Sequence, residues 1–321
     1  MEAHLDGSSR HHACISASAR RHREPVRAAV RLGRAVRPPG IINTVYALGD
    51  AWVLRVPRNH PAHAAQLRRE VAAIPAARAT GVCTPGVLAF DDAQDILPVP
   101  YLIVERIHGR SIESLDVDPV EYAAAWRHLG ADLARLHTAE PSGPAAGLDH
   151  RAGEDRDVRE LLDARAHDGW LSPVETRWVA RWLRKLEPAV SHPLPDRLVH
   201  GDVQMSNVLV ATATGAYLAL VDWGCARWDD DTLDFVSLPM RAVPSVPSVL
   251  AGHREIAPTD DDESKEARIV WRRLHLILSV LPRGAAPHCS WGERPVAWFA
   301  DLVRFFVDPP GRRWRAVGPP P

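Results

Sequence analysis

The sequence predicts an α+β protein of two lobes, with a small sheet-rich N-terminal lobe followed by a larger, mainly helical lobe. Short apolar runs bounded by turn residues gather between about residues 45 and 105, and apolar residues at three- and four-residue spacing dominate afterwards. A few short strands, over residues 197–221, interrupt the helical part. A chain of 321 residues is long enough for two lobes, and we expect a cleft between them near residues 105–111.

The N-terminal lobe is expected over residues 35–109. Gly49-Asp50, between two apolar runs, predicts a β-hairpin. Apolar side chains on one face predict a helix from residue 61 to 79, but Pro75 lacks a backbone N–H and predicts that this helix breaks near Ala73. The expected strands cover residues 45–48, 51–56, 87–90 and 101–105.

The C-terminal lobe is expected over residues 110–308. Its first long helix has Trp126, Leu129, Leu133 and Leu136 on one face, which is the spacing of a buried helical stripe. The expected helices cover residues 121–137, 175–186, 264–281 and 295–307, and the expected strands cover residues 197–199, 208–211 and 217–221.

The two ends of the chain read differently from the lobes. Residues 1–34 are rich in Arg, His, Ser and Ala without an apolar period, so we expect a disordered leader. Residues 309–321 are rich in Pro, Gly and Arg, and we expect a frayed tail. The leader lacks the apolar core of a secretory signal, which favours a cytoplasmic protein.

The charge balance excludes some classes of partner. The formal net charge is −1, so composition predicts neither a nucleic-acid partner nor attraction to a membrane surface. No apolar run approaches the roughly 18 residues of a membrane span. Cysteines are few and widely spaced, without the clustering of a metal site.

The most informative segment contains His200, Asp202 and Asn207, and a strand ending at Asp222 follows it. Phosphoryl transfer to an alcohol requires a carboxylate that orients the hydroxyl and accepts its proton, and Asp202 fits this role. Mg²⁺ prefers oxygen ligands, and Asn207 and Asp222 would meet at one end of a β-hairpin. We therefore place Asp202 and His200 in the catalytic loop, where His200 holds the loop by packing and hydrogen bonding.

The stretch HGDVQMSNVLV followed by VDWG resembles the catalytic segment of the aminoglycoside phosphotransferase family, which is related to choline kinases and more distantly to protein kinases. The resemblance implies a protein-kinase-like fold, ATP and Mg²⁺ as cofactors, and a small-molecule hydroxyl acceptor. Gly201 and Trp223 stand where protein kinases have Arg and Phe, which favours the small-molecule branch. The resemblance also implies that Asp234 braces the catalytic loop.

Four residues of the N-terminal lobe receive nucleotide-binding roles from the same resemblance. Arg55 corresponds to the basic residue that grips the α- and β-phosphates, although protein kinases have Lys there, and Glu70 corresponds to the helix carboxylate that pairs with it. Asn43 belongs to the nucleotide-covering loop. Glu105 ends the strand that leads into the hinge, whose backbone would bind adenine.

The acceptor is predicted less directly. The acidic clusters at residues 229–231 and 260–263 would attract a polycation such as an aminoglycoside, and we favour the first cluster because it lies close to Asp222. Trp223 and Trp228 would suit an apolar acceptor pocket. We therefore expect an O-phosphotransferase that acts on an antibiotic, aminoglycoside-like, or on a related natural product. The alternatives are a metabolic kinase of choline, a sugar or an amino-alcohol, and a catalytically silent nucleotide-binding protein of the same fold.

Overall fold

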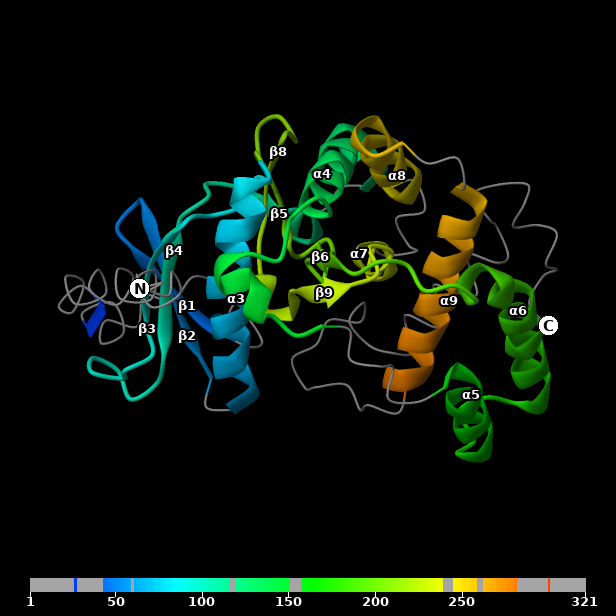
Figure 1. The fold of residues 1–321 in the computed structure, drawn as a ribbon. Coiled ribbons are helices and arrows are strands. Elements are labelled where there is room, and N and C mark those ends of the chain that lie inside the picture. Colours follow the sequence, from blue (N-terminus) through cyan, green and yellow to red (C-terminus); the bar gives the residue numbers. More distant parts are fainter. Residues whose placement is uncertain are drawn as a thin grey trace, which may run out of the picture.

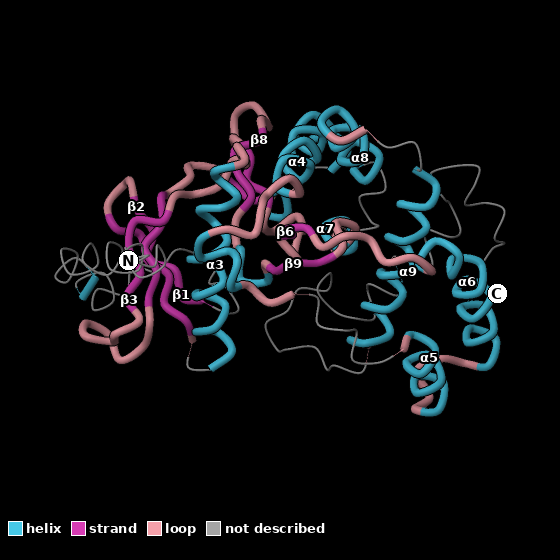
Figure 2. Tube along the Cα trace, in the orientation of Figure 1, coloured by secondary structure: helices cyan, strands magenta, loops and turns pink. Residues whose placement is uncertain are grey.

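The computed structural model has the predicted α+β plan, with an antiparallel sheet at one end and a helical body at the other (Figure 1). Strands occupy the sheet end and the centre, and the far end of the molecule is helical (Figure 2). The structure describes residues 26–27, 43–58, 61–115, 119–150, 157–238, 245–258, 262–281 and 300.

The N-terminal sheet has four antiparallel strands in the order β1-β2-β4-β3. Its hairpin turns at Gly49, whose φ of 63° is a conformation that glycine adopts without steric cost. Alternating side chains separate the two faces, so that Leu54 and Ile103 enter one apolar cluster while Leu102 and Val104 pack with helix α3 (Pro61–Ala79). The strands are β1 (Asn43–Leu48), β2 (Trp52–Pro57), β3 (Val87–Asp91) and β4 (Tyr101–Glu105).

Helix α3 (Pro61–Ala79) corrects one prediction, because it continues through Pro75 instead of breaking near Ala73. An interior proline costs about 3 kcal/mol in an isolated helix. Here Ile74 and Ala77 on the last turns are almost fully buried in the main core of the molecule. The free energy gained by that burial offsets the lost hydrogen bond. A local sequence pattern does not show how deeply a helix will be buried, so the prediction missed this compensation.

The helical part is built around two apolar clusters. The main cluster contains α4 with Trp126 and Leu129, together with the central strands, and a second cluster joins α5, α6 and α9 around Trp178 and Trp182. The helices are α4 (Ala123–Leu136), α5 (Val158–His167), α6 (Pro173–Val190), α7 (Leu233–Val236), α8 (Ser245–Ile256) and α9 (Asp262–Val280).

Helix α6 is longer than the predicted 175–186 at both ends. Ser172 and Glu175 form a capping box, with the Ser172 backbone N–H donating to Glu175 at 2.7 Å, and Pro173 occupies the first turn. A capping box together with an N-terminal proline is a strong start signal for a helix, and the prediction overlooked it.

Five short strands support the central part of the helical body. β5 (Arg110–Ser111), β7 (Val208–Val210) and β8 (Tyr217–Leu220) form one antiparallel sheet, and β6 (Arg197–Val199) pairs with β9 (Arg227–Asp229). The second sheet holds the ends of the segment that carries His200, Asp202 and Asp222.

Helices α4 and α8 approach very closely at two glycines. A methyl group at Gly130 would overlap the Val249 carbonyl, and one at Gly252 would overlap the Arg127 carbonyl. Only glycine therefore allows this crossing, which packs residues 249–253 of α8 against residues 127–130 of α4.

The predicted leader, tail and helix 295–307 lie outside the described residues, apart from residues 26–27 and 300, and the domain limits remain predictions. Within the described part of the chain, every helix is too short or too polar to cross a membrane.

Candidate active site

Strands β7 and β8 bring Asn207 and Asp222 to the same end of a hairpin. Val208 lies opposite Leu220, and the Val221 N–H donates to the Asn207 carbonyl at 3.0 Å. Asp222 follows immediately and has a φ of 71°, a left-handed conformation that is uncommon for a non-glycine residue and that recurs at functional sites. The structure therefore brings together the two residues that the sequence predicted as Mg²⁺ ligands.

Asp202 is held from two sides by side-chain amides. Asn207 Nδ2 donates to the Asp202 carbonyl at 2.8 Å and to its carboxylate at 3.1 Å. Gln204 Nε2 lies 3.1 and 2.9 Å from the two carboxylate oxygens of Asp202. Gln204 was not among the predicted site residues. Its position two residues after Asp202 in the loop is the signal that could have identified it.

The two carboxyl groups of the site differ in their electrostatics. Burial raises the pKa of Asp202, and nearby Asp222 adds to this, while His200 and the two amide hydrogen bonds oppose it. Burial also disfavours ionisation of Asp222, but the charge and hydrogen bond of Arg55 outweigh it and hold the pKa of Asp222 below its usual range. Asp222 is therefore the more persistent anion, and Asp202 is the carboxylate more ready to take a proton.

Arg55 connects the N-terminal sheet to this hairpin. It lies on β2 opposite Val45, and its Nη1 donates to Glu70 of α3 in a very short ion pair, while its Nη2 donates to Asp222 Oδ1 at 2.8 Å. The fork of a guanidinium can bond two carboxylates at once, which the point charge of Lys does less well. Burial raises the pKa of Glu70 above its ordinary value, with Arg55 acting against it.

His200 uses both ring nitrogens on the backbone of the loop. Its Nε2 donates to the Val221 carbonyl at 3.0 Å, its Nδ1 accepts from the Asp202 N–H at 3.3 Å, and the ring meets Trp223 edge-on. The ring is fully buried. These contacts fit the expected loop-holding role.

Asp234 braces the same loop from behind, as the resemblance implied. Its carboxylate accepts from the backbone N–H groups of His200 at 3.1 Å and Gly201 at 2.7 Å. Gly201 has a φ of 77°, and a side chain there would overlap the Cys225 carbonyl, so the loop requires glycine at this position.

Asn43 and Glu105 do not join this group. Asn43 is buried at the start of β1, opposite Pro57. The Glu105 carboxylate accepts from the Gly86 N–H at 3.2 Å, and its own backbone N–H donates to the Gly86 carbonyl. Within the described residues, neither shares a hydrogen bond with Arg55, Asp202 or Asp222, and their nucleotide-binding roles remain predictions.

The expectation that the acidic cluster at residues 229–231 attracts the acceptor is corrected, because the charges of this cluster are neutralised within the protein. Asp229 bonds Arg272 at 2.8 Å, Asp230 bonds Arg268 at 3.2 Å, and Asp231 bonds Lys265 at 2.8 Å. The three cations lie on α9 at spacings of three and four residues, which places them on one helix face. This cluster is therefore unavailable to a polycationic acceptor. The side chains of residues 260–263 lie outside the described part.

The predicted location of Trp223 and Trp228 is also corrected, because both side chains lie in the core and not in an acceptor pocket. Both are buried, and their indole N–H groups donate to Thr84 Oγ1 and to the Ala145 carbonyl, each at 2.8 Å. Their aromatic surface therefore packs inside the protein and presents no wall to an acceptor.

Comparisons with known proteins agree with this geometry. The model of the phosphotransferase enzyme family (APH) matches residues 35–264. The structure is similar to the GDP complex of wild-type aminoglycoside 2'-phosphotransferase-IIIa, with a TM-score of 0.61 and 18% identity over 85% of this chain and 93% of that one. It is also similar to a choline/ethanolamine kinase family protein from Mesorhizobium loti, with a TM-score of 0.61 and 19% identity over 94% and 98% of the two chains.

A third solved structure, the GDP and kanamycin complex of APH(2")-IIIa, has a TM-score of 0.58 and 18% identity over 77% of this chain and 84% of that one. At these identities the likeness establishes the kinase-like fold. The family match covers more than two thirds of the sequence and includes every residue of the site described above, so this chain belongs to the phosphotransferase enzyme family.

Proposed function

We propose that this protein transfers the γ-phosphoryl group of ATP to a hydroxyl of a small molecule, with Asp202 as the base. One observation carries the proposal: Asp202, Asn207, Asp222 and Arg55 gather at the end of the β7–β8 hairpin. Asn207 bonds Asp202, the Val221 N–H next to Asp222 bonds the Asn207 carbonyl, and Arg55 bonds Asp222. A silent nucleotide-binding protein would not need a carboxylate oriented by two amides.

The donor set fits Mg²⁺. Asp222 supplies an anionic carboxylate whose side chain is 36% exposed. Asn207 directs its amide N–H₂ toward Asp202, and its side-chain carbonyl oxygen accepts a long hydrogen bond from the Ser206 hydroxyl at 3.4 Å, which a cation could replace. Asp222 and Asn207 would hold the ion, which would supply neutralisation of the phosphate charge when bound.

The chain's own residues would carry the transfer as follows. Gln204 and Asn207 hold the Asp202 carboxylate in one orientation, and this carboxylate accepts the proton of the acceptor hydroxyl. The hydroxyl oxygen forms the new bond to the γ-phosphorus as the bond from that phosphorus to the bridging oxygen breaks, which releases ADP. Arg55 would turn one arm of its fork from Asp222 to the phosphates.

An aminoglycoside-like antibiotic is the acceptor class we propose first, because solved structures of the same fold include complexes with kanamycin and gentamicin. The neutralised cluster at residues 229–231 gives that class no electrostatic support. A metabolic acceptor such as choline is the second candidate, favoured by the similarity to a choline/ethanolamine kinase family protein over nearly the whole chain.

The test is an acceptor panel. Purified protein is incubated with Mg²⁺ and ATP or GTP, together with aminoglycosides, other antibiotics, choline, ethanolamine and sugars, and nucleoside diphosphate release is followed. We expect turnover with one acceptor class and none with Asp202→Ala. GTP is included because two related structures hold GDP. Equal turnover by the Asp202→Ala variant would refute the assignment of the base.

A further inference from the structure

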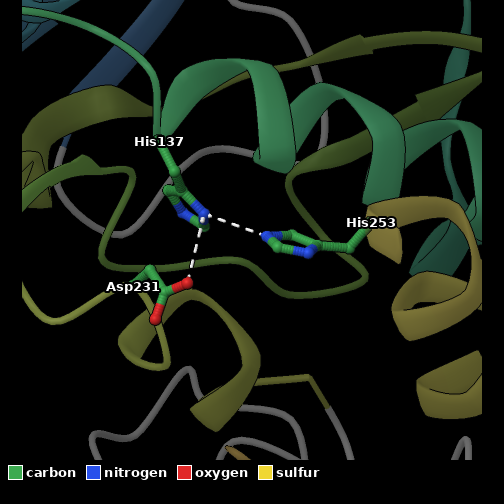
Figure 3. Close-up of side chains that lie close together, drawn as sticks. All are labelled: His137, Asp231 and His253. Carbon is green, nitrogen blue, oxygen red and sulfur yellow. Dashed lines mark hydrogen bonds and ion pairs between the residues drawn. The ribbon is translucent and has the colours of Figure 1, made fainter. Parts of the chain in front are cut away.

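A second cluster of polar side chains, outside the site described above, contains His137, Asp231 and His253 (Figure 3). His137 from the end of α4, Asp231 from the segment before α7, and His253 from α8 direct one donor atom each toward a common point, and these atoms lie within 4.8 Å of one another. His137 Nδ1 is 3.3 Å from His253 Nε2 and 3.9 Å from Asp231 Oδ2. We name these three residues the His–Asp–His cluster.

The close crossing of α4 and α8 creates this cluster. His253 directly follows Gly252, one of the two glycines that allow the helix backbones to approach. A larger residue at Gly130 or Gly252 would separate the helices and withdraw His253 from His137. The proximity of the two imidazoles is therefore built into the packing of the helices.

His137 connects the cluster to the catalytic loop. Its Nε2 donates to Asp234 Oδ2 at 3.0 Å, and Asp234 accepts from the backbone N–H groups of His200 and Gly201. A displacement of the His137 ring would therefore change the partner of the carboxylate that holds the loop.

The donor atoms are those of a divalent metal site. Two imidazole nitrogens and a carboxylate are common ligands of Zn²⁺, and a ligating histidine usually donates its other ring N–H to a carboxylate, as His137 does to Asp234. Burial, followed by the charge of Lys265, lowers the pKa of His253 to about 3, which favours the neutral imidazole in the folded protein.

The cation position, however, is already taken by a side chain of this chain. Lys265 of α9 places its ammonium 2.8 Å from Asp231 Oδ2, 3.5 Å from His253 Nε2, and 4.9 Å from the centre of the Phe235 ring. A carboxylate, an imidazole nitrogen and an aromatic face together surround the ammonium.

We propose that Lys265 is the resident cation of the His–Asp–His cluster, and that Lys265 and His253 are positioning residues for the catalytic loop. They act through His137 and Asp234 and touch no reacting atom. The inference rests on the proposed phosphotransfer for its effect on turnover, but the cation exchange itself can be measured without activity. Helices α8 and α9 thereby reach the catalytic loop through the contacts of Lys265 with His253, of His253 with His137, and of His137 with Asp234.

The test replaces Lys265 and offers a metal in its place. Lys265→Ala vacates the cation position. Two measurements report on the catalytic loop: hydrogen exchange of the His200 and Gly201 amides, and the kcat and KM for ATP. We expect faster exchange and a kcat about tenfold lower, with KM for ATP changed less than about twofold. Lys265→Arg keeps a cation and should restore kcat. Lys185→Ala, on the exposed face of α6, removes the other lysine of the chain and is the matched control.

Zn²⁺ should then bind Lys265→Ala with a stoichiometry of one in calorimetry and slow the exchange of the two amides again. The double variant Lys265→Ala/His253→Gln should lose this binding, because it lacks one ligand. If Lys265→Ala showed the same amide exchange and the same kcat as the wild type, the proposal would be overturned. Binding of Zn²⁺ to the wild-type protein at this cluster with the same affinity would also overturn it, because the resident cation would then be a metal. If the wild type turned over no acceptor while the exchange results were as expected, the proposed function alone would be refuted.

Discussion

The brace at Asp234 allows a quantitative prediction for Asp234→Asn. The carboxylate is fully buried and accepts three N–H groups: the His200 amide at 3.1 Å, the Gly201 amide at 2.7 Å and His137 Nε2 at 3.0 Å. Asparagine has nearly the same shape, but one of its two terminal atoms is a donor. Whichever way the amide is turned, at least one N–H group of the protein faces another N–H group.

The magnitude follows from those three contacts. In the better orientation, two acceptor contacts survive without charge assistance and the Gly201 N–H loses its partner. A hydrogen bond to a charged group contributes about 1.5–3 kcal/mol, and a buried donor left without a partner costs about 1–3 kcal/mol. We expect a loss of about 3–5 kcal/mol in unfolding free energy, which corresponds to a fall in Tm on the order of 10 °C.

The assay is thermal unfolding followed by tryptophan fluorescence, with kcat measured below the transition. Asp92→Asn is the matched control, because Asp92 is an exposed carboxylate that bonds Arg68 at 2.8 Å, and exposed ion pairs contribute at most about 1 kcal/mol. If Asp234→Asn unfolded within about 2 °C of the control, Asp234 would not be the brace of the catalytic loop.

Three further predictions concern the site and the helix crossing. Gln204→Leu removes a hydrogen bond that stabilises the Asp202 carboxylate, so its pKa should rise further and the acid limb of the kcat/KM profile should move to higher pH; an unchanged limb would contradict the role of Gln204. Arg55→Met should weaken ATP binding in calorimetry and destabilise the protein by about 3–5 kcal/mol, because buried Glu70 loses its cation. Adding Glu70→Leu to this variant should recover much of the stability but none of the ATP binding. Gly130→Ala should lower Tm by several degrees, whereas Gly147→Ala, where a methyl group meets no atom within 4 Å, should not.

Much of the geometry of the candidate site could be predicted because its key residues belong to one local unit. Asp202 and Asn207 lie on one loop, and the strands on either side of the next turn carry Asn207 and Asp222 to the same end of a hairpin. A short hairpin follows from apolar runs and a turn, so the convergence of these residues is visible in the sequence. The antiparallel N-terminal sheet was predictable for the same reason.

The failures have a common physical cause, which is pairing over long sequence distances. The charges of residues 229–231 are neutralised by α9, whose cations lie 34 to 43 residues further along the chain. The sequence contains the required spacing of Lys265, Arg268 and Arg272, but it does not show which surface that face of α9 covers. The continuation of α3 through Pro75 likewise depends on burial against the helical body.

The proposed phosphotransfer depends most on Asp222, which with Asn207 would hold the Mg²⁺ that accompanies ATP. The most direct test is calorimetry of ATP binding with Mg²⁺ and with EDTA, comparing the wild type with Asp222→Asn. We predict that Mg²⁺ strengthens ATP binding to the wild type about tenfold or more, and that Asp222→Asn loses this gain while still binding ATP without the metal. The same gain from Mg²⁺ in Asp222→Asn, or no ATP binding to the wild type under either condition, would contradict the claim.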